Sequence, residues 1–445
     1  MKKFLLFSIS CCAVASLWAQ DADEPVSFRC DGIRYQVDAD NPGNVTVVNV
    51  EGYKESDLRL PSQVTDEATG ISYQVTAIGM EAFYGSPVQN LAIPASVNVI
   101  AGNAFFNANY LKTISVAEEN GSFTGRDGVL YNKNLTRLCC FPSYKSFGTY
   151  TLPASVTELG DYAFCGVFLN KFEIPASVTG IGRGAFMGTK LKNVVVPSTV
   201  KELGGEVFQN CSSLESIEFP EGMTVLPDHT LTYCKMLKYI KLPESLTEIG
   251  DYAFDGTFVY GSAYGLISEL VLPSNVRKIG IGAFSGNHGL ASITLGSKVE
   301  TIGMYAFSNC TSLSEVKSLN ESVPSCLNED GGNDVAFTFN GVPANCVLYV
   351  PEAAVSAYTA GWGEKFKDIR PIETGGVDDV GMDSGDIRVS SANGLLEVEA
   401  PGVVIEVFNA AGVLVARAAD GSLSVALPAG VYMVSAGTSV RKVVL

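Results

Sequence analysis

Histidine is almost absent from this sequence of 445 residues, which contains only His229 and His288. Neither belongs to an HExxH motif, so a zinc hydrolase would lack its ligands. Catalysis by a cysteine needs a base beside the thiol, and only His229 with Cys234 comes near that arrangement. We interpret His229 as a solvated turn residue instead. Because GxGxxG and Walker motifs are also missing, we predict no enzyme activity, no catalytic residue, no metal and no cofactor.

Basic residues are also scarce. The chain has 30 lysines and arginines against 47 aspartates and glutamates, and its formal net charge is −17 at pH 7. Such an acidic surface repels phosphate backbones, and no basic stripe offsets it. We therefore expect no nucleic acid partner and no binding to anionic membranes, and we attribute the charge to solubility.

Carboxylates recur along the chain, at Glu158, Asp161, Glu202, Glu206, Glu248 and Asp251. A glycoside hydrolase needs one acid pair in a cleft, with pKa values that differ. Acids repeated along a surface are more typical of solubilising positions, so a glycan-active enzyme is the least favoured alternative. The acidic stretches 328–334 and 378–386 could offer oxygen ligands to calcium, but they lack the full ligand spacing, and we interpret both as loops.

Long apolar runs are absent except at the N-terminus. Residues 1–19 contain two lysines, an apolar run from Phe4 to Trp18 and a small residue at Ala19, as a secretory signal peptide does. A lipid-anchored form, cleaved before Cys11, is the alternative. No later segment is long and apolar enough to span a membrane. We expect a secreted or cell-surface protein on the exterior of the outer membrane.

Cysteine occurs eleven times, twice within the predicted signal, and never as CxxC, so a zinc site is excluded. Cys211 and Cys234 occupy equivalent positions in adjacent repeats, where stacking would bring them within disulfide range. The favoured alternative is a buried slot for small residues that holds free thiols. Cys326 and Cys346 are a second candidate pair.

One short sequence motif recurs many times, for example as "LPASVTELGDYAF" at 152–164 and "LPESLTEIGDYAF" at 242–254. Its prolines are Pro61, Pro94, Pro153, Pro175, Pro197, Pro220, Pro243 and Pro273. Undisturbed copies repeat every 22 or 23 residues, and periods of this size indicate a solenoid. A single coil cannot bury its own apolar side chains, so the coils must stack.

Each position in the repeat has a predicted role. The segment "LESIEFP" alternates as a strand does, and its proline ends the strand. The phenylalanine of the "AF" pair, which we call the plug, fills the coil, and the plugs should form one axial column. They are Phe83, Phe105, Phe164, Phe186, Phe208, Phe254, Phe284 and Phe307. Glycine or asparagine follows two residues after each plug, which predicts a corner with positive φ.

This pattern resembles the BspA-like leucine-rich repeat family of surface proteins over about residues 57–350. The resemblance implies a mainly β fold, a leucine-rich-repeat solenoid with short parallel strands. We assign the repeats to 57–346, with a hairpin insertion at 117–149, and a C-terminal cap to 347–372, plugged by Tyr358 and Trp362. The motif "IGxxAF" is missing at 220–234, and we expect a distorted coil there.

The remaining segments lie at the two ends. Residues 20–56 alternate like hairpins and should form an N-terminal β cap. Residues 373–386 are rich in glycine and aspartate and indicate a linker. Residues 387–445 predict a small C-terminal β-sandwich. Its "LPAGVYMVSAGTSVRKVVL" resembles the sorting domains of the type IX (Por) secretion route, which implies export across the outer membrane; a small accessory domain is the alternative.

Outward strand positions predict one continuous face in two rows. The rows are Lys171, Asn193, Ser216, Tyr239, Glu269, Ser292 and, beside them, Glu173, Val195, Glu218, Lys241, Val271, Thr294. We predict ligand binding by Asn193, Ser216, Tyr239, Lys241, Glu218, Glu269 and Thr294. The insertion 257–265 either overhangs this face with Phe258, Tyr260 and Tyr264 or only pads an edge.

The favoured function is non-catalytic recognition of a host or neighbouring-cell protein or glycan. The family resemblance implies adhesion to host matrix proteins or other cells. The alternatives are a self-associating envelope scaffold and, less favoured, the glycan-active enzyme. The oligomeric state stays open.

Overall fold

The computed structural model of this chain describes residues 26–145, 150–261, 265–328 and 331–372 without interruption, and then the segments 377–379, 388–392, 395–400, 404–409, 414–419, 421–427, 430–436 and 439–444. The predicted signal peptide and Tyr264 lie outside the described residues. So does most of the predicted linker, within which Val377–Asp379 form a short strand, β29.

The N-terminal segment folds as hairpins, as its alternating pattern predicts. Strands β1 (Ser27–Cys30), β2 (Ile33–Val37) and β3 (Asn44–Asn49) are antiparallel neighbours. Strand β3 then pairs in parallel with β6 (Ser72–Ile78), and β5 (Gln63–Thr65) forms the edge. This sheet covers the first coils of the solenoid.

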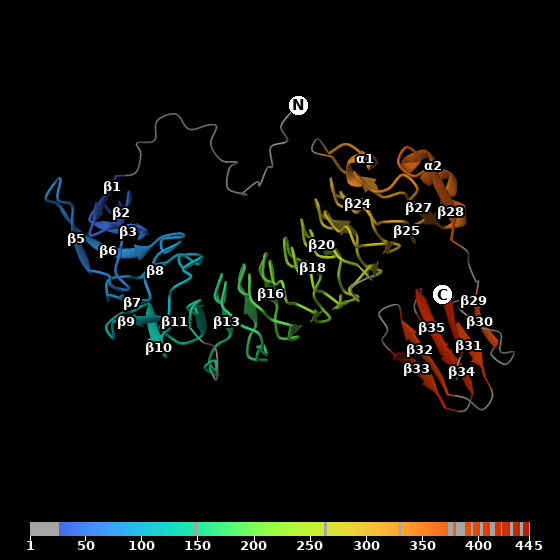
Figure 1. Ribbon diagram of the computed structural model, residues 1–445, viewed down its shortest axis with the longest axis horizontal. Coiled ribbons are helices and arrows are strands. Elements are labelled where there is room, and N and C mark those ends of the chain that lie inside the picture. The colour runs from blue at the N-terminus through green and yellow to red at the C-terminus, as the bar shows by residue number, and fades with distance from the viewer. Residues whose placement is uncertain are drawn as a thin grey trace.

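The coils stack side by side along a curved axis (Figure 1). Most coils contribute to a row of longer strands, which we call the long-strand row. Its members are β4 (Asp57–Arg59), β7 (Asn90–Ile93), β9 (Thr113–Val116), β15 (Asn193–Val195), β17 (Ser216–Glu218), β19 (Tyr239–Lys241), β21 (Glu269–Val271), β23 (Ser292–Leu295), β25 (Glu315–Ser318), β27 (Val347–Val350) and β28 (Asp368–Pro371). Their central apolar residues point inward, for example Ile217, Ile293 and Leu348.

A second row of two-residue strands, the short-strand row, follows the proline of each coil. Its members are β8 (Val99–Ile100), β13 (Glu158–Leu159), β14 (Gly180–Ile181), β16 (Glu202–Leu203), β18 (Val225–Leu226), β20 (Glu248–Ile249), β22 (Lys278–Ile279), β24 (Thr301–Ile302) and β26 (Ser325–Cys326). Neighbouring members pair in parallel from β13 to β16 and from β18 to β26, so the prediction of a solenoid with short parallel strands is confirmed.

Six of the eight predicted plugs form an axial column, whereas Phe83 and Phe105 pair 5.2 Å apart in a separate N-terminal core. Phe164, Phe186 and Phe208 stack with ring centroids 5.4 and 5.6 Å apart and planes within 7°. A second stack joins Phe254, Phe284, Phe307 and Phe339 at 5.0, 5.3 and 5.0 Å. Between the two stacks the plug position holds Leu231, which is fully buried. The side chains of the two stacks and Leu231 belong to one continuous core.

The corners are also as predicted. The glycine or asparagine two residues after each plug has a φ between 55° and 71° at all eight positions, which are Gly85, Asn107, Gly166, Gly188, Asn210, Gly256, Gly286 and Asn309. A second corner, two residues before most plugs, also has positive φ. It holds larger residues, among them Tyr162, Glu206, His229 and Tyr252. The left-handed conformation there is stabilised by hydrogen bonds to the next coil, for example from the Tyr252 amide to the Ile281 carbonyl at 2.8 Å.

The irregular coil at 220–234 keeps the overall path and still accepts bonds from the Glu206, Phe208 and Asn210 amides of the coil before it, but it loses the bonds of the short-strand row. In regular coils a glycine amide crosses to the previous coil, as Gly250 does to the Leu226 carbonyl at 2.8 Å. Pro227 occupies that position and has no N–H to donate. In the described chain β16 and β18 do not pair, and the short-strand row is interrupted between them. The predicted distortion is therefore a local break in the hydrogen-bond ladder.

We expect the amides of Thr224 and Val225 to exchange with deuterium at least about tenfold faster than those of Thr247 and Glu248. The latter two donate to the Thr224 carbonyl at 2.8 and 3.1 Å, whereas within the described coils the amides of Thr224 and Val225 donate to no acceptor. Hydrogen exchange resolved to single amides tests this expectation. Equal protection of the two pairs would mean that the ladder is intact at Pro227.

Added elements lie within the solenoid and near its C-terminal end. The hairpin insertion forms β10 (Phe123–Arg126), β11 (Val129–Asn132) and β12 (Arg137–Cys140). Near the C-terminal end lie α1 (Val335–Thr338), a 3₁₀ turn (Glu352–Ala354) and α2 (Val355–Trp362). Helix α2 stands between β27 and β28 and buries Tyr358 and Trp362 completely, as the family resemblance implies. No helix in the described part of the chain is long and apolar enough to cross a membrane.

The C-terminal strands form two antiparallel sheets. One has the order β29-β36-β35-β32-β33 and the other β30-β31-β34. Their bounds are β30 (Arg388–Ala392), β31 (Leu395–Glu399), β32 (Ile405–Asn409), β33 (Leu414–Ala418), β34 (Ser422–Ala426), β35 (Val431–Ala436) and β36 (Ser439–Val444). Buried residues from both sheets, among them Val398 and Val407, share one small core. This arrangement agrees with the predicted sandwich.

Candidate recognition surface

The long-strand row is divided into three sheets rather than one. The sheets are β4-β7-β9, β15-β17-β19 and β21-β23-β25-β27-β28. Residues 169–175, which carry Lys171 and Glu173, form no strand. The prediction of one continuous outward face is therefore wrong at two places, between β9 and β15 and between β19 and β21.

The middle sheet brings five of the predicted ligand-binding residues together. Asn193, Ser216 and Tyr239 are direct neighbours on successive strands, and so are Glu218 and Lys241. The Ser216 hydroxyl donates to the Asn193 side-chain oxygen at 2.7 Å. Desolvation raises the pKa of Tyr239, and the nearby Glu218 carboxylate adds to the effect. Tyr239 thus presents a protonated phenol among polar side chains.

The other two predicted residues lie on the next sheet. Glu269 and Thr294 are on β21 and β23, which do not continue from β19. The insertion that precedes β21 places Phe258 in the core, where it stacks on Phe254 at 5.6 Å and is 2% exposed. Tyr260 is exposed. Of the two alternatives for the insertion, Phe258 therefore pads the core, and Glu269 and Thr294 belong to a separate surface.

Sequence reasoning missed the surface residues at the end of the sheet that begins with β21. Strands β25, β27 and β28 add Lys317, Tyr349 and Arg370 in register beside Thr294. The Lys317 ammonium lies 5.9 Å from the centre of the Tyr349 ring, and Arg370 pairs with Asp368 at 2.5 Å. The signal was the alternation in "SEVKS" and "VLYV", and Pro351 ends the second of these strands as the prolines of the repeat do.

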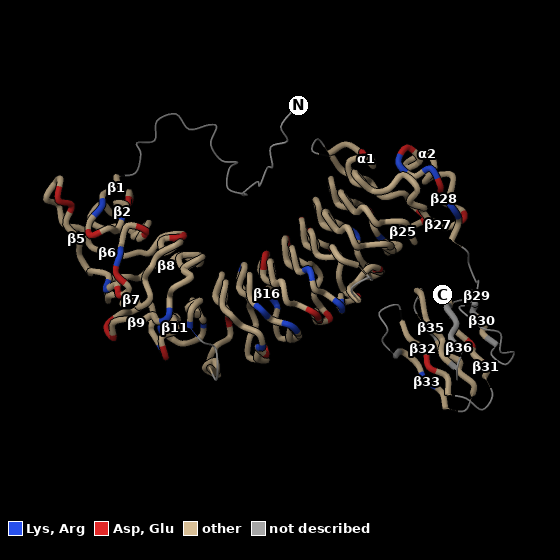
Figure 2. Tube along the Cα trace, viewed as in Figure 1, with Lys and Arg blue, Asp and Glu red and all other residues tan. Residues whose placement is uncertain are grey.

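Charges of both signs are interspersed along the coils (Figure 2). On the row, Glu215 lies between two lysines from neighbouring coils, with its carboxylate 2.7 Å from the Lys238 ammonium and 3.8 Å from that of Lys192. Such exposed pairs contribute little to stability. Their main consequence is a mixed, polar surface of the kind found at interfaces with proteins or glycans.

The described residues contain no group of three or more histidines, cysteines, aspartates and glutamates that could hold a metal ion. His229 and Cys234 do not form a catalytic pair. The His229 ring stacks on Tyr252 at 5.0 Å, and its Nδ1 lies 3.4 Å from the Thr232 hydroxyl. Burial raises the pKa of the Cys234 thiol well above its usual value, so it is protonated at neutral pH.

All nine cysteines of the described chain are free thiols, so both candidate disulfides are wrong and the slot for free thiols is confirmed. The slot lies three residues after the plug. There Cys211, Cys234 and Cys310 donate to the plug carbonyls of Phe186, Phe208 and Phe284 at 3.1, 3.1 and 3.2 Å. Thr257 and Asn287 donate in the same way from their own coils. The slot is therefore a buried ladder of small donors that satisfies the plug carbonyls.

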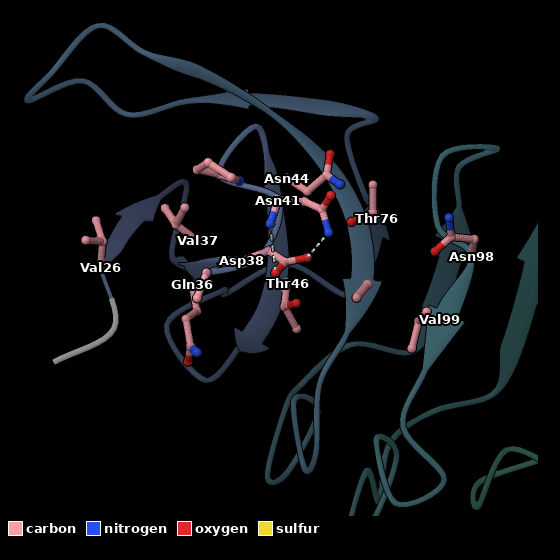
Figure 3. Close-up of a pocket in the computed structure, with 13 residues that line it drawn as sticks. Val26, Gln36, Val37, Asp38, Asn41, Asn44, Thr46, Thr76, Asn98 and Val99 are labelled. Carbon is pink, nitrogen blue, oxygen red and sulfur yellow. Dashed lines mark hydrogen bonds between the residues drawn. The ribbon is translucent and has the colours of Figure 1, made fainter. Parts of the chain in front are cut away.

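A depression in the N-terminal cap is lined by polar side chains from the hairpin and from β6 and β8 (Figure 3). The carboxylate of Asp38 in this depression already accepts hydrogen bonds from the backbone amides of Asp40 and Asn41, at 3.0 and 3.3 Å. These bonds close a turn. Figure 3 shows Asn41 beside Asp38, and Thr76 and Asn98 on the side of the depression that β6 and β8 form. We see no catalytic arrangement in this depression.

Parallel strands stacked as successive coils, each filled by a plug, define a leucine-rich-repeat protein. The chain belongs to the family of the BspA type leucine rich repeat region, whose model matches in six copies over residues 67–150, 136–259 and 262–328. The resemblance seen in the sequence is thereby confirmed. No curated protein matches the chain.

Several solved structures are similar to parts of this chain. A leucine-rich repeat protein from Eubacterium ventriosum is 22% identical, with 72% of this chain and 95% of that chain covered and a TM-score of 0.40. One from Bacteroides ovatus is 20% identical, with 78% and 100% covered and a TM-score of 0.40. The pneumococcal vaccine antigen PcpA is 18% identical, with 79% and 99% covered and a TM-score of 0.34.

Proposed function

We propose that this chain is a non-catalytic recognition protein, secreted or held at the cell surface, that binds a protein or glycan through the long-strand row. Membership of the BspA type repeat family supports a role at the cell surface. The observation that carries the proposal is the register of β15, β17 and β19, which sets polar and aromatic side chains side by side. Such rigid strands lose little conformational entropy when a partner binds.

The centre of this surface is Tyr239 with Lys241. Both stand on β19, and Tyr239 combines a half-buried ring with a polar tip. Aromatic residues of this kind contribute most of the binding energy at many interfaces. The neighbours Asn193, Ser216 and Glu218 then provide hydrogen-bonding groups around it.

We expect the double substitution Tyr239→Ala and Lys241→Glu to weaken binding to the partner by at least about tenfold. The measurement is binding of the purified protein to arrays of extracellular matrix proteins and of glycans. Tyr84→Ala with Lys298→Glu is the matched control, because both residues are exposed and lie outside the row. Equal binding by the two double variants would contradict the proposal, and concentration-dependent self-association without a ligand would favour the scaffold.

A further inference from the structure

A depression of about 1040 Å³ opens where the long-strand row is missing, between β9 and β15. Its walls come from the end of the hairpin insertion, at 143–145 and 150–152, and from the coil at 168–175. The side chains that define it are Tyr144, Lys145, Phe168, Lys171, Phe172 and Glu173. It lies outside the strands assigned above to recognition.

Two successive coils, at 150–152 and 172–174, contribute no strand here, and the second carries the large ring of Phe172. Phe172 stands at the inward position that Val194 and Ile217 occupy in the next two coils. Its ring reaches the plug column, with centroids 5.2 Å from Phe164 and 5.7 Å from Phe186. Tyr150 occupies the equivalent position in the coil before, so a large ring is present in both coils that leave the ladder.

Two exposed aromatic side chains border the depression. Phe168 is 73% exposed and Tyr144 is 61% exposed. Lys190 and Ser212 occupy the position of Phe168 in the next two coils, so a polar residue fits the repeat there. Large apolar side chains exposed around a concave surface indicate a binding site.

The depression is basic, although the chain as a whole is strongly acidic. Lys145 and Lys171 line it, and the Lys112 ammonium lies 5.2 Å from the centre of the Tyr144 ring. Glu173 is the only carboxylate among the residues that line it, and its pairing with Lys171 at 3.9 Å joins two highly exposed side chains and is therefore weak. Arg126 and Asp127, further along the insertion, pair with each other. Three ammonium groups around aromatic faces complement a ligand with apolar ring faces and negative charge.

We propose that this depression binds an acidic polysaccharide, with pyranose rings lying on Phe168 and Tyr144 and uronate carboxylates against Lys145, Lys171 and Lys112. The C–H face of a pyranose ring is apolar and matches an aromatic face, while its carboxylate matches an ammonium group. An extended acidic peptide fits less well. It would add to a strand edge, and no residue of β15 lines the depression.

The test is titration calorimetry of the purified protein with a hexamer of galacturonic acid and with its fully methyl-esterified form. We expect the acidic hexamer to bind, the ester to bind at least about tenfold more weakly, and raised salt to weaken binding. Phe168→Ala should reduce the affinity at least about tenfold, and so should Lys145→Glu with Lys171→Glu. Because Phe168 is exposed, its replacement should leave the unfolding transition unchanged.

The matched controls separate this site from the long-strand row. Tyr84→Ala and the pair Tyr239→Ala with Lys241→Glu should bind the acidic hexamer like the unchanged protein. If the long-strand row proved not to bind a partner in the array assay, this proposal would be unaffected. If the depression proved not to bind the acidic hexamer, the proposed function of the row would likewise be unaffected. The proposal is overturned by equal binding of hexamer and ester, by unchanged affinity of Phe168→Ala, by no binding, or by tighter binding of hexaglutamate.

Discussion

Replacing Phe284 by alanine is expected to lower the free energy of unfolding by about 3–5 kcal/mol. The Phe284 ring is completely buried between Phe254 and Phe307, with centroids 5.0 and 5.3 Å away. Its removal loses the transfer free energy of the ring and leaves a cavity that two stacked neighbours cannot fill. Urea-induced unfolding followed by circular dichroism measures the change.

Phe337→Ala is the matched control, because Phe337 is 44% exposed and lies outside the column. Its replacement should cost less than about 1 kcal/mol. If both alanine variants unfolded at the same urea concentration, the plugs would not be the stabilising axis of the solenoid.

The second large effect is expected for Gly282→Ala, at about 2–4 kcal/mol of destabilisation. Gly282 has a φ of 58°, and a Cβ at this position would lie 2.3 Å from Cε1 of Tyr252. The Tyr252 ring cannot easily move away, because His229 stacks on it at 5.0 Å. Alanine at this position is therefore destabilised both by its left-handed backbone conformation and by a steric clash with the Tyr252 ring.

Gly166→Ala separates the two contributions. Gly166 has a φ of 69°, but a Cβ there would meet nothing within 4 Å, so only the backbone cost of about 1 kcal/mol remains. In a protein that already carries Tyr252→Ala, the destabilisation by Gly282→Ala should fall nearly to that of Gly166→Ala. A double-mutant cycle measures this change. Equal effects of the two glycine substitutions would rule out the packing of Tyr252 over Gly282.

The repeat made most of the fold predictable from sequence. The plugs and the glycine or asparagine corners recur at fixed offsets, and each position has one physical reason, burial or positive φ. Glycine signals the second corner only at Gly184 and Gly282, since tyrosine, glutamate and histidine at the other positions do not signal a left-handed backbone. Hydrogen bonds to the next coil stabilise that conformation, and such bonds appear only in the folded stack.

The candidate surface was less predictable. Alternation identified the outward residues of β15, β17 and β19, but not the two interruptions of the row. The first spans the two coils that carry Tyr150 and Phe172, and the second follows the insertion before β21. Pro227 was visible in the sequence, yet its effect depends on the crossing hydrogen bond that its glycine counterparts donate.

The coil that contains Pro227 also has mechanical significance. A rod pulled from its two ends carries the load through each junction between coils in series, so the junction with the fewest bonds yields first. Thr224, Val225 and Pro227 donate no backbone hydrogen bond across their junction within the described chain, and in the same coil Leu231 interrupts the stacked rings. Under shear, the backbone of this junction relies on the amides of Glu206, Phe208 and Asn210, which donate to the Asp228, Thr230 and Thr232 carbonyls, whereas regular junctions also share the load with the short-strand row.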